Sequence, residues 1–438
     1  MCGYAARGRF HQTKFFYLCN RISYEVFQGQ VGGFLVHIVI VGCGVAGATA
    51  AMKLGETSAE IDISIFTDEL DLYYPRPRLY EVISREKEPQ EIYSFPQQLF
   101  EARGVKVYLN KKVLNIDLGK KQLLLQDYSR IDYDKLLLAN GARAFVPPIK
   151  GVEKKGVFTL RTITDALAIR EYAMKTDKAI VIGAGLLGLE LAACLRKTGK
   201  QVQLVEINPR VLPSQLDQEG AEILEDELKT LGIYPVTSVK TSEILGKDEV
   251  TGVSLSNGEE LSGGLVLIAA GIKSNIDLAA DAGIKVNKGV IVDEYLQTSV
   301  NDVYAAGDVS EFDGRVYGII PPAIEQAKIA SLNMLDKERH VFRGTIPTTT
   351  LKIAGISLTS MGLTNPQGSQ YEEIKKVSRQ ENVYKKIVLK QGKIVGAVIL
   401  GQRKDAAVIM KLMDQEVDVT KYKDQLLEED FDYRKIIP

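Results

Sequence analysis

Residues 36–54 read VHIVIVGCGVAGATAAMKL, an apolar run followed by a glycine-rich turn and a run of small residues. A continuous apolar run is typical of a strand buried on both faces of a parallel sheet. In the GxGxxG turn, Gly42 permits a tight bend, Gly44 lets the backbone approach a pyrophosphate, and Gly47 lets a helix pack on the strand. The stretch therefore predicts a strand, a dinucleotide-binding turn and a helix whose N-terminus faces an anion.

The same order of features returns at residues 178–199, which read KAIVIGAGLLGLELAACLRKTG. Two such units predict two dinucleotide-binding domains, because a GxGxxG that follows an apolar strand and opens a helix is a specific signal. The predicted nucleotide contacts in the two turns are Gly42, Gly44, Val45, Ala46 and Gly47 in the first, and Gly183, Gly185, Leu186 and Gly188 in the second.

The residue that ends the second strand of each unit should bind a ribose. After the second turn this strand reads QVQLVE, and its terminal Glu206 would accept hydrogen bonds from both ribose hydroxyls and repel a 2′-phosphate. We therefore expect NAD rather than NADP, although Arg210 lies close enough to weaken that preference. In the first unit Thr67 occupies the corresponding slot, so the predicted ribose contact moves to Asp68.

The length and the net charge of the chain indicate how many domains it has and which partners it does not attract. A chain of 438 residues is too long for one hydrophobic core and has room for two or three domains. The 55 basic and 56 acidic residues give a net charge of −1, so we expect no general attraction to nucleic acid or to an anionic membrane. The apolar runs are shorter than the roughly 18 to 20 residues of a transmembrane helix. We expect a cytoplasmic protein.

The four cysteines, Cys2, Cys19, Cys43 and Cys194, form no CxxC pair. Their spacing argues against a disulfide scaffold, an iron–sulfur cluster and a zinc site, and we expect no metal. Residues 1–35 lack the apolar core and cleavage site of a secretory signal. A targeting peptide stays open, but we expect a disordered extension or an upstream start-site choice.

Hairpin patterns occur between and after the two units. Residues 120–133 and 250–261 predict small antiparallel sheets, and Asn257-Gly258 is a strong two-residue turn signal in the second of them. Residues 384–401 predict a further hairpin turned at Gln391-Gly392, followed by a charged helical tail from Asp405. We therefore expect residues 345–438 to form a separate α+β domain.

Three further segments resemble one known family. Residues 133–142, YDKLLLANGA, are similar to its ATG segment, with Asn140 where threonine is usual. Residues 265–275, LVLIAAGIKSN, are similar to the corresponding segment after the NAD domain, with Ser274 in place of proline. Residues 298–309, TSVNDVYAAGDV, are similar to its second FAD motif. From Val36 to about Gly401 the chain resembles the FAD-dependent pyridine nucleotide–disulfide oxidoreductase superfamily.

This resemblance implies an α/β fold of two Rossmann-like domains, with the NAD domain (148–271) inserted into the FAD domain (36–147 and 272–344), and the α+β domain (345–438) last. It implies that Asp308 binds the ribitol chain of FAD and that Glu190 lies near the flavin and the nicotinamide. The other cofactor contacts it implies are Val113, Ala139, Asn140, Gly141, Gly271 and Gly307.

The subfamily depends on residues 72–79, LYYPRPRL, because thiol-dependent members carry a redox cysteine in this region. The pattern resembles the rubredoxin reductase, ferredoxin reductase and nitrite reductase flavoprotein branch. Arg76 would then place a positive charge near the flavin, Pro77 would rigidify the loop, and both would act with Glu190 in catalysis. The alternative is a surface turn with Arg76 and Arg78 solvated.

We therefore expect an oxidoreductase that takes electrons from NADH through FAD to an external acceptor, with rubredoxin or a similar small redox protein as first choice. One alternative is an NADH oxidase that uses dioxygen and releases hydrogen peroxide. Another, of a different class, is a flavoprotein subunit or sensor with slow turnover. NADPH use stays open because of Arg210, and a homodimer is compatible with each alternative.

Overall fold

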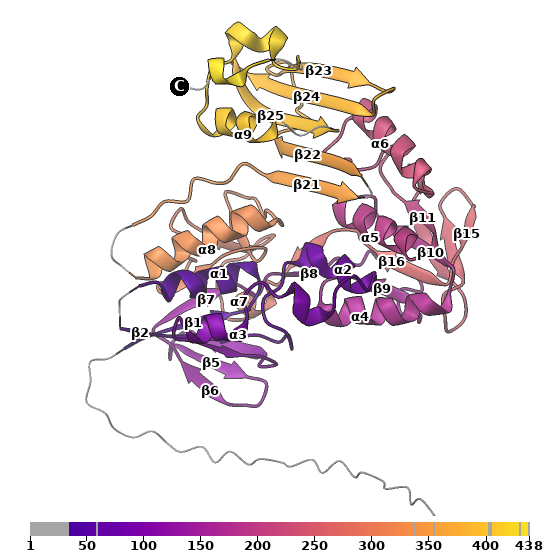
Figure 1. The fold of residues 1–438 in the computed structure, drawn as a ribbon. Coiled ribbons are helices and arrows are strands. Elements are labelled where there is room, and N and C mark those ends of the chain that lie inside the picture. Colours follow the sequence, from indigo (N-terminus) through magenta and orange to yellow (C-terminus); the bar gives the residue numbers. More distant parts are fainter. Residues whose placement is uncertain are drawn as a thin grey trace, which may run out of the picture. The chain divides into compact units, whose positions relative to one another are not determined.

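The computed structural model describes residues 35–57, 60–335, 339–353, 355–401, 405–428 and 431–436. The predicted extension 1–35 lies, apart from Leu35, outside the described residues. The apolar run that opens the regular pattern forms strand β1 (Val36–Val41), the centre of a five-stranded parallel sheet (Figure 1). The strand order is β19-β7-β1-β2-β3, with β2 at Ile61–Phe66, β3 at Val105–Tyr108, β7 at Lys135–Leu138 and β19 at Val303–Ala305.

Small residues bring helix α1 (Val45–Leu54) close to this first sheet and to helix α8 (Ile320–Met334). α1 and α8 lie side by side in Figure 1, and the Ser331 hydroxyl donates to the backbone carbonyl of Ala50 at 3.2 Å. The alanines of α1 are buried because they face both partners. Shorter helices of this domain are α3 (Gln97–Glu101) and α7 (Asp277–Asp281).

The second sheet repeats the first. Its order is β12-β11-β10-β16-β9, with β9 at Val157–Thr159, β10 at Lys178–Ile182, β11 at Gln201–Val205, β12 at Ile233–Val236 and β16 at Leu265–Ile268. Helices α4 (Ile163–Tyr172), α5 (Leu186–Lys197) and α6 (Gln218–Thr230) belong to this domain. In both sheets the first strand of the unit lies at the reversal of strand order, which is where dinucleotides bind in such folds.

Two antiparallel strands join the Rossmann domains. β8 (Ala142–Ala144) leaves the first domain and pairs with β17 (Ile272–Ser274), which returns to it. Every strand of the second sheet lies between them in sequence. The predicted fold class, with one Rossmann-like domain inserted into the other, is confirmed, whereas the residue boundaries of the domains stay predictions.

Each Rossmann domain carries a small three-stranded sheet. In the first, β4 (Val113–Asp117), β5 (Gln122–Leu125) and β6 (Arg130–Asp132) form a meander. In the second, β13 (Thr241–Leu245), β14 (Gly252–Leu255) and β15 (Glu260–Ser262) do the same. Both predicted hairpins are therefore confirmed. A short parallel pair, β18 (Val290–Val292) and β20 (Ser310–Phe312), completes the first domain.

The C-terminal domain is an antiparallel sheet of order β21-β22-β25-β24-β23. The strands are β21 (Thr348–Ile353), β22 (Ile356–Gly362), β23 (Glu372–Ser378), β24 (Val383–Lys390) and β25 (Lys393–Leu400). Gln391 and Gly392 both adopt positive φ, at 51° and 74°, which is the two-residue hairpin geometry that the sequence predicts.

The predicted charged helical tail from Asp405 is wrong in extent. Helix α9 spans only Ala406–Asp414, and Ile409, Leu412 and Met413 on it are buried in the core of the C-terminal domain. Beyond α9 the described residues form single helical turns at Thr420–Gln425 and Tyr433–Lys435. Apolar packing therefore sets the length of the helix. Within the described ranges, none of the helices combines the length and the apolar character that crossing a membrane requires.

Candidate functional site

A cavity of about 1430 Å³ opens at the carboxyl ends of β1 and β7. Residues of both Rossmann domains line it, together with Thr348, Thr349 and Thr350 of β21. It brings together most of the predicted site residues: Gly42, Gly44, Val45, Ala46, Asp68, Arg76, Pro77, Val113, Ala139, Asn140, Gly141, Leu186, Glu190, Gly307 and Asp308. Gly47, Gly183, Gly185, Gly188, Glu206 and Gly271 are not part of this lining.

The first glycine turn has the shape of a pyrophosphate cradle. A Cβ placed on Gly44 would have no heavy atom within 4 Å, so the backbone there faces open space. Gly44 is also the N-cap of α1 and makes no side-chain cap, which leaves the first amide groups of the helix to a ligand. A Cβ on Gly47 would lie 1.9 Å from the Gly42 carbonyl oxygen, so only glycine permits this close packing. These residues fit the pyrophosphate of FAD.

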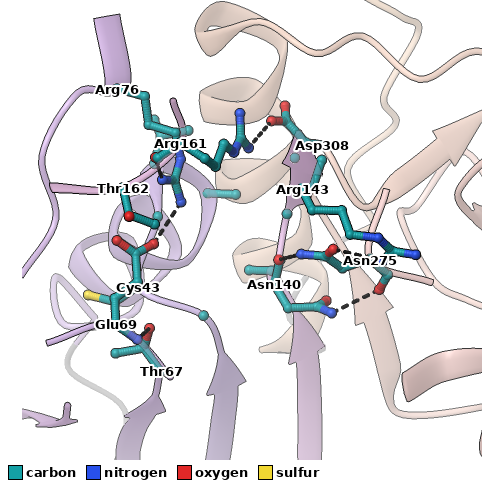
Figure 2. A pocket seen from close by; sticks show the side chains of 18 of the residues that line it. Cys43, Thr67, Glu69, Arg76, Asn140, Arg143, Arg161, Thr162, Asn275 and Asp308 are labelled. Atoms are coloured by element: carbon teal, nitrogen blue, oxygen red, sulfur yellow. Dashed lines mark hydrogen bonds and ion pairs between the residues drawn. The ribbon is translucent and has the colours of Figure 1, made fainter. Parts of the chain in front are cut away.

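Arg76 is fixed on the cavity wall. Its Nη2 lies 2.7 Å from Glu69 Oε1 and its Nη1 donates to the backbone carbonyl of Arg161 (Figure 2). The Tyr74 hydroxyl donates to the same Glu69 carboxylate. Burial acts to lower the pKa of Arg76, but Glu69, Tyr74 and Asp308 together outweigh it and raise that pKa. The guanidinium is therefore a permanent charge in a defined place. Arg78 instead pairs with Glu81.

Arg161 reaches the cavity from the end of β9. Its Nη2 lies 2.7 Å from Asp308 Oδ2 (Figure 2), and its Nε is buried without a hydrogen-bond partner among the described residues. Burial and the charge of Arg76 lower the pKa of Arg161, while Asp308 acts in the opposite direction. A buried donor without an acceptor is costly, so a ligand oxygen beside Nε would be stabilising. This is a second feature that fits FAD.

Sequence reasoning missed Glu69 and Arg161 as residues of this site. Arg161 lies in the range 148–271, which was assigned to the other nucleotide, and no motif marks it. The available signal was its position two residues after the end of a strand, where ligand-binding residues of parallel sheets occur. Glu69 directly follows the predicted ribose contact Asp68.

Asn140 and Ser274, two of the departures from the family pattern, make hydrogen bonds at the crossovers between the Rossmann domains. Asn140 donates from Nδ2 to the backbone carbonyl of Asn275, and Asn275 donates in the same way to Asn140 (Figure 2). Ser274, which stands where proline is usual, donates from its hydroxyl to the backbone carbonyl of Asp308 at 2.7 Å. These side chains therefore connect the two crossovers to each other and one of them to the backbone of Asp308.

Burial shifts the pKa of Glu190 and of the two described cysteines. Glu190 projects from α5 into the cavity, and burial raises its pKa to about 7. Burial also raises the pKa of Cys43, in the first glycine turn, and of Cys194, on α5, to about 12. Both thiols are therefore neutral at physiological pH, whereas Glu190 is close to half ionised.

The strand registers show which residues correspond in the two nucleotide units. Val41 aligns with Phe66, and Ile182 aligns with Val205, so Thr67 and Glu206 occupy equivalent places. Thr67 is buried and Asp68 is exposed at the rim of the cavity. Asp68 as the ribose contact stays a prediction.

Glu206 faces the second glycine turn. Its Oε2 accepts from the Ala184 amide at 2.7 Å, and its Oε1 accepts from the amide and the side chain of Asn208 at 2.8 and 2.6 Å. Arg210 is turned toward its own loop, where Nε donates to the Leu216 carbonyl at 2.8 Å. The carboxylate is thus held in position at the turn while the nearby guanidinium is engaged elsewhere.

Two family models match the chain. The model described as pyridine nucleotide-disulphide oxidoreductase matches residues 36–332, and that of the rubredoxin NAD+ reductase C-terminal domain matches residues 347–417. Nitrite reductase [NAD(P)H] of Bacillus subtilis is 34% identical over 386 residues, which cover 88% of this chain and 48% of that protein. NADH-rubredoxin oxidoreductase of Clostridium acetobutylicum is 32% identical over 379 residues, covering 86% and 94%.

The relatives differ from this chain in length, and one solved structure superposes closely on it. The chain spans about half the length of the nitrite and nitrate reductase relatives. NADH oxidase of Methanocaldococcus jannaschii is 33% identical over 341 residues, covering 74% of this chain and 76% of that protein. A ferredoxin reductase from Rhodopseudomonas palustris superposes with a TM-score of 0.82 at 28% identity, over 91% of this chain and 99% of that chain.

Proposed function

The chain belongs to the pyridine nucleotide-disulphide oxidoreductase family, whose cofactors are FAD and NAD(H), and on this premise we propose that it passes electrons from NADH to a small redox protein such as rubredoxin. One observation carries the proposal. The cysteine that lines the cavity, Cys43, is a buried neutral thiol, and a fixed guanidinium, Arg76, lies on the cavity wall. Such a cavity suits electron delivery to an external acceptor better than thiol chemistry.

FAD, when bound, supplies the chemistry of accepting a hydride and releasing electrons. The residues of the chain bind and orient it. The open backbone at Gly44 and the N-terminus of α1 would hold the pyrophosphate, and Asp308 with Arg161 would hold the ribitol side. Arg76 would stabilise negative charge that develops on the ring, at no reorganisation cost because Glu69 already fixes it.

Helix α5 connects the two nucleotide sites. It begins at Leu186, directly after the second glycine turn, and it projects Leu186, Leu187 and Glu190 into the cavity. A nicotinamide nucleotide held at the second turn, with its ribose hydroxyls on Glu206, would therefore extend along α5 toward the cavity. Glu190 would lie where the two cofactors meet, and its raised pKa lets it hold or release a proton near neutral pH.

Two alternatives have a specific observation in their favour. The NADH oxidase relative favours dioxygen as the acceptor, because dioxygen needs only access to the flavin and the cavity is large. The half-length match to the nitrite and nitrate reductase relatives favours a flavoprotein subunit that serves a larger reductase. Both alternatives share the FAD and NADH sites with the main proposal and differ in the acceptor alone.

The acceptor is tested by anaerobic stopped-flow reduction of the purified flavoprotein with NADH, followed by mixing with oxidised rubredoxin or with air-saturated buffer. We expect fast reoxidation by rubredoxin and slow reoxidation by dioxygen. Rapid peroxide formation would instead establish the oxidase, and a protein without flavin would overturn the proposal. In parallel, Arg76→Gln should slow reduction, whereas Arg78→Gln, in the same loop but paired with Glu81, should not.

A further inference from the structure

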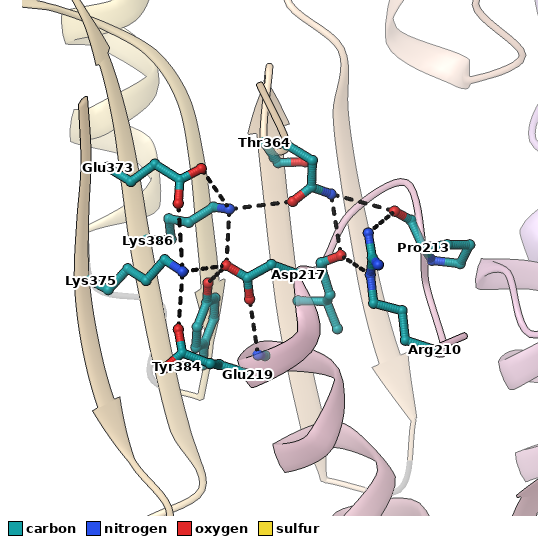
Figure 3. Close-up of polar contacts among 12 residues, drawn as sticks. Arg210, Pro213, Asp217, Glu219, Thr364, Glu373, Lys375, Tyr384 and Lys386 are labelled. Carbon is teal, nitrogen blue, oxygen red and sulfur yellow. Dashed lines mark hydrogen bonds and ion pairs between the residues drawn. The ribbon is translucent and has the colours of Figure 1, made fainter. Parts of the chain in front are cut away.

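The two ends of the loop between β11 and α6 contact different parts of the molecule. Its first residue, Glu206, faces the second glycine turn. Its last residue, Asp217, caps α6 through a hydrogen bond from the Gly220 amide at 3.2 Å and also accepts from two residues of β24 (Figure 3). These are the Tyr384 hydroxyl at 2.6 Å and Lys386 Nζ at 3.1 Å. One short loop therefore joins the nucleotide-binding edge to the C-terminal domain.

The contact at Asp217 is charged and partly buried. Only 1% of the Lys386 side chain is exposed, and its ammonium also contacts Glu373 Oε1 at 3.4 Å. Lys375 Nζ lies 2.8 Å from the Asp217 carboxylate (Figure 3). Burial acts to raise the pKa of Asp217, but its hydrogen bonds from Lys375 and Tyr384 outweigh this and lower it. A buried ion pair with several hydrogen bonds fixes relative geometry, so this end of the loop is held firmly.

The middle of the loop is held by the same domain. Asn365 Nδ2 donates to the backbone carbonyls of Leu216 at 3.2 Å and Pro213 at 3.4 Å, and Lys386 in turn donates to Asn365 Oδ1 at 3.3 Å. The Thr364 hydroxyl donates to the Ser214 carbonyl at 3.1 Å. Thr364 and Asn365, in the turn after β22, therefore hold three carbonyl groups of the loop in place, those of Pro213, Ser214 and Leu216.

Those carbonyl groups also bind Arg210. Its Nε donates to Leu216 at 2.8 Å and its Nη2 to Pro213 at 3.3 Å, so Arg210 and Asn365 share the same two acceptors. An arginine near the strand-end acid is the residue type that accommodates the 2′-phosphate of NADP. Arg210 follows Glu206 by four residues, but its guanidinium is bound to the loop. The conformation that the C-terminal domain imposes on the loop is therefore the one that engages Arg210.

We propose that Asn365 is a positioning residue for nucleotide selection, which keeps Arg210 on the loop carbonyls and away from the ribose edge at Glu206. The proposal rests on the proposed NADH site at Glu206. It makes the C-terminal domain part of the selection of NADH, although none of its residues needs to touch the nucleotide.

The decisive variant is Asn365→Leu in the FAD-loaded enzyme. It roughly preserves the size of the side chain and brings no charge near Arg210, but it removes the donor to the carbonyls of Leu216 and Pro213. Calorimetry with ADP-ribose and with its 2′-phosphate would measure selection directly. We expect the preference for the unphosphorylated ligand to fall about three- to tenfold, the effect of one or two lost hydrogen bonds. KM for NADH should rise, with kcat and the flavin spectrum unchanged.

Two further variants identify the cause. Asn365→Leu combined with Arg210→Gln should lose the gain in binding of the 2′-phosphate, because the gain requires the released guanidinium. Asn382→Asp is the control, since Asn382 also lies at the contact with α6 but donates to Glu227, outside the loop. It should leave the preference unchanged. Thr364→Val, which removes only the contact to Ser214, should shift the preference in the same direction by less.

An unchanged preference in Asn365→Leu would overturn the proposal, and so would an equal change in Asn382→Asp. Glu206→Gln separates this failure from failure of the proposed NADH site. If Glu206→Gln weakens binding of ADP-ribose while Asn365→Leu has no effect, the nucleotide site stands and the positioning role of Asn365 is wrong. If Glu206→Gln has no effect, the site itself is wrong, and the positioning role is overturned with it.

Discussion

Asn140 and Asn275 hold each other across the two crossovers that join the Rossmann domains. Each donates from Nδ2 to the backbone carbonyl of the other, at 2.9 and 2.8 Å, and the Asn275 amide also donates to the Gly141 carbonyl at 2.9 Å. The two residues are 135 positions apart in sequence. Because Asn140 and Asn275 both line the cavity, this pair holds the two crossovers together at the cavity wall.

The two reciprocal hydrogen bonds between Asn140 and Asn275 should stabilise the fold cooperatively. Asn140→Ala removes one partly buried hydrogen bond and should lower the free energy of unfolding by about 1 kcal/mol. Asn275→Ala removes the reciprocal bond and also an exposed bond from Arg143, and should lower it by at least as much. Each of the two bonds depends on the geometry that the other maintains. The free energy of unfolding should therefore fall less in the double variant than the sum of the decreases in the two single variants. Chemical denaturation of the four proteins measures this. Asn115→Ala, at an exposed position of β4, serves as a control, and strict additivity would contradict the coupling.

Arg161 should be required for FAD binding. Arg161→Ala removes the partner of Asp308 and leaves a partly buried carboxylate without its counter-charge. We expect the Kd for FAD to rise about tenfold or more, the range for hydrogen bonds to charged groups. Fluorescence titration of the apoprotein with FAD measures it. Arg170→Ala, whose partner Glu88 is exposed, should bind FAD as the unaltered protein does, and equal affinities in both variants would refute the role of Arg161.

Both Rossmann-like units could be predicted because their signals are local. Apolar runs such as residues 36–41 mark buried parallel strands, and the first glycine of each turn, Gly42 and Gly183, has a positive φ that glycine adopts readily. The equivalence of Thr67 and Glu206 was likewise visible, since both directly follow the second strand of their unit. Periodicity and position were sufficient for these features.

Other features depend on contacts between distant segments, which local patterns do not report. Arg161 enters the cavity from a segment assigned to the other nucleotide, and its role depends on reaching Asp308, 147 residues away. Lys386 lies in a strand whose charged residues would be expected to face solvent, but Asp217 and Glu373 surround it in the interior. The pairing of charges across domains became visible only in three dimensions.

The two described cysteines should be chemically inert. Because burial raises the pKa of Cys43 and Cys194 to about 12, little thiolate exists at pH 8. We expect neither to react with iodoacetamide in the native flavoprotein, as measured by peptide mass spectrometry, and we expect both to react after denaturation. Cys43→Ser and Cys194→Ser should retain turnover with NADH within about twofold of the original. Loss of activity on alkylation of Cys43 or Cys194 would indicate that a thiol takes part in the reaction.

Glu190 should make stability depend on pH in a defined direction. Its folded pKa of about 7 lies above the ordinary value of 4.5, because burial disfavours the carboxylate. Between these two values the folded state binds more protons than the unfolded state. The free energy of unfolding therefore falls as pH rises from about 4.5 to about 7, and this contribution is constant above that range. The shift corresponds to a loss of up to about 3 kcal/mol.

Glu190→Gln removes the titrating group and keeps its shape. Denaturant unfolding at pH 5, 6, 7 and 8 should show the variant gaining stability relative to the original protein up to about pH 7 and no further. Glu86→Gln is the control of opposite sign, since Lys197 lowers the pKa of Glu86 and its stabilising effect is lost only as the pH falls. If the difference between Glu190→Gln and the original protein were the same at every pH, Glu190 would titrate normally, and a proton-holding role for it beside the two cofactors would lose its physical basis.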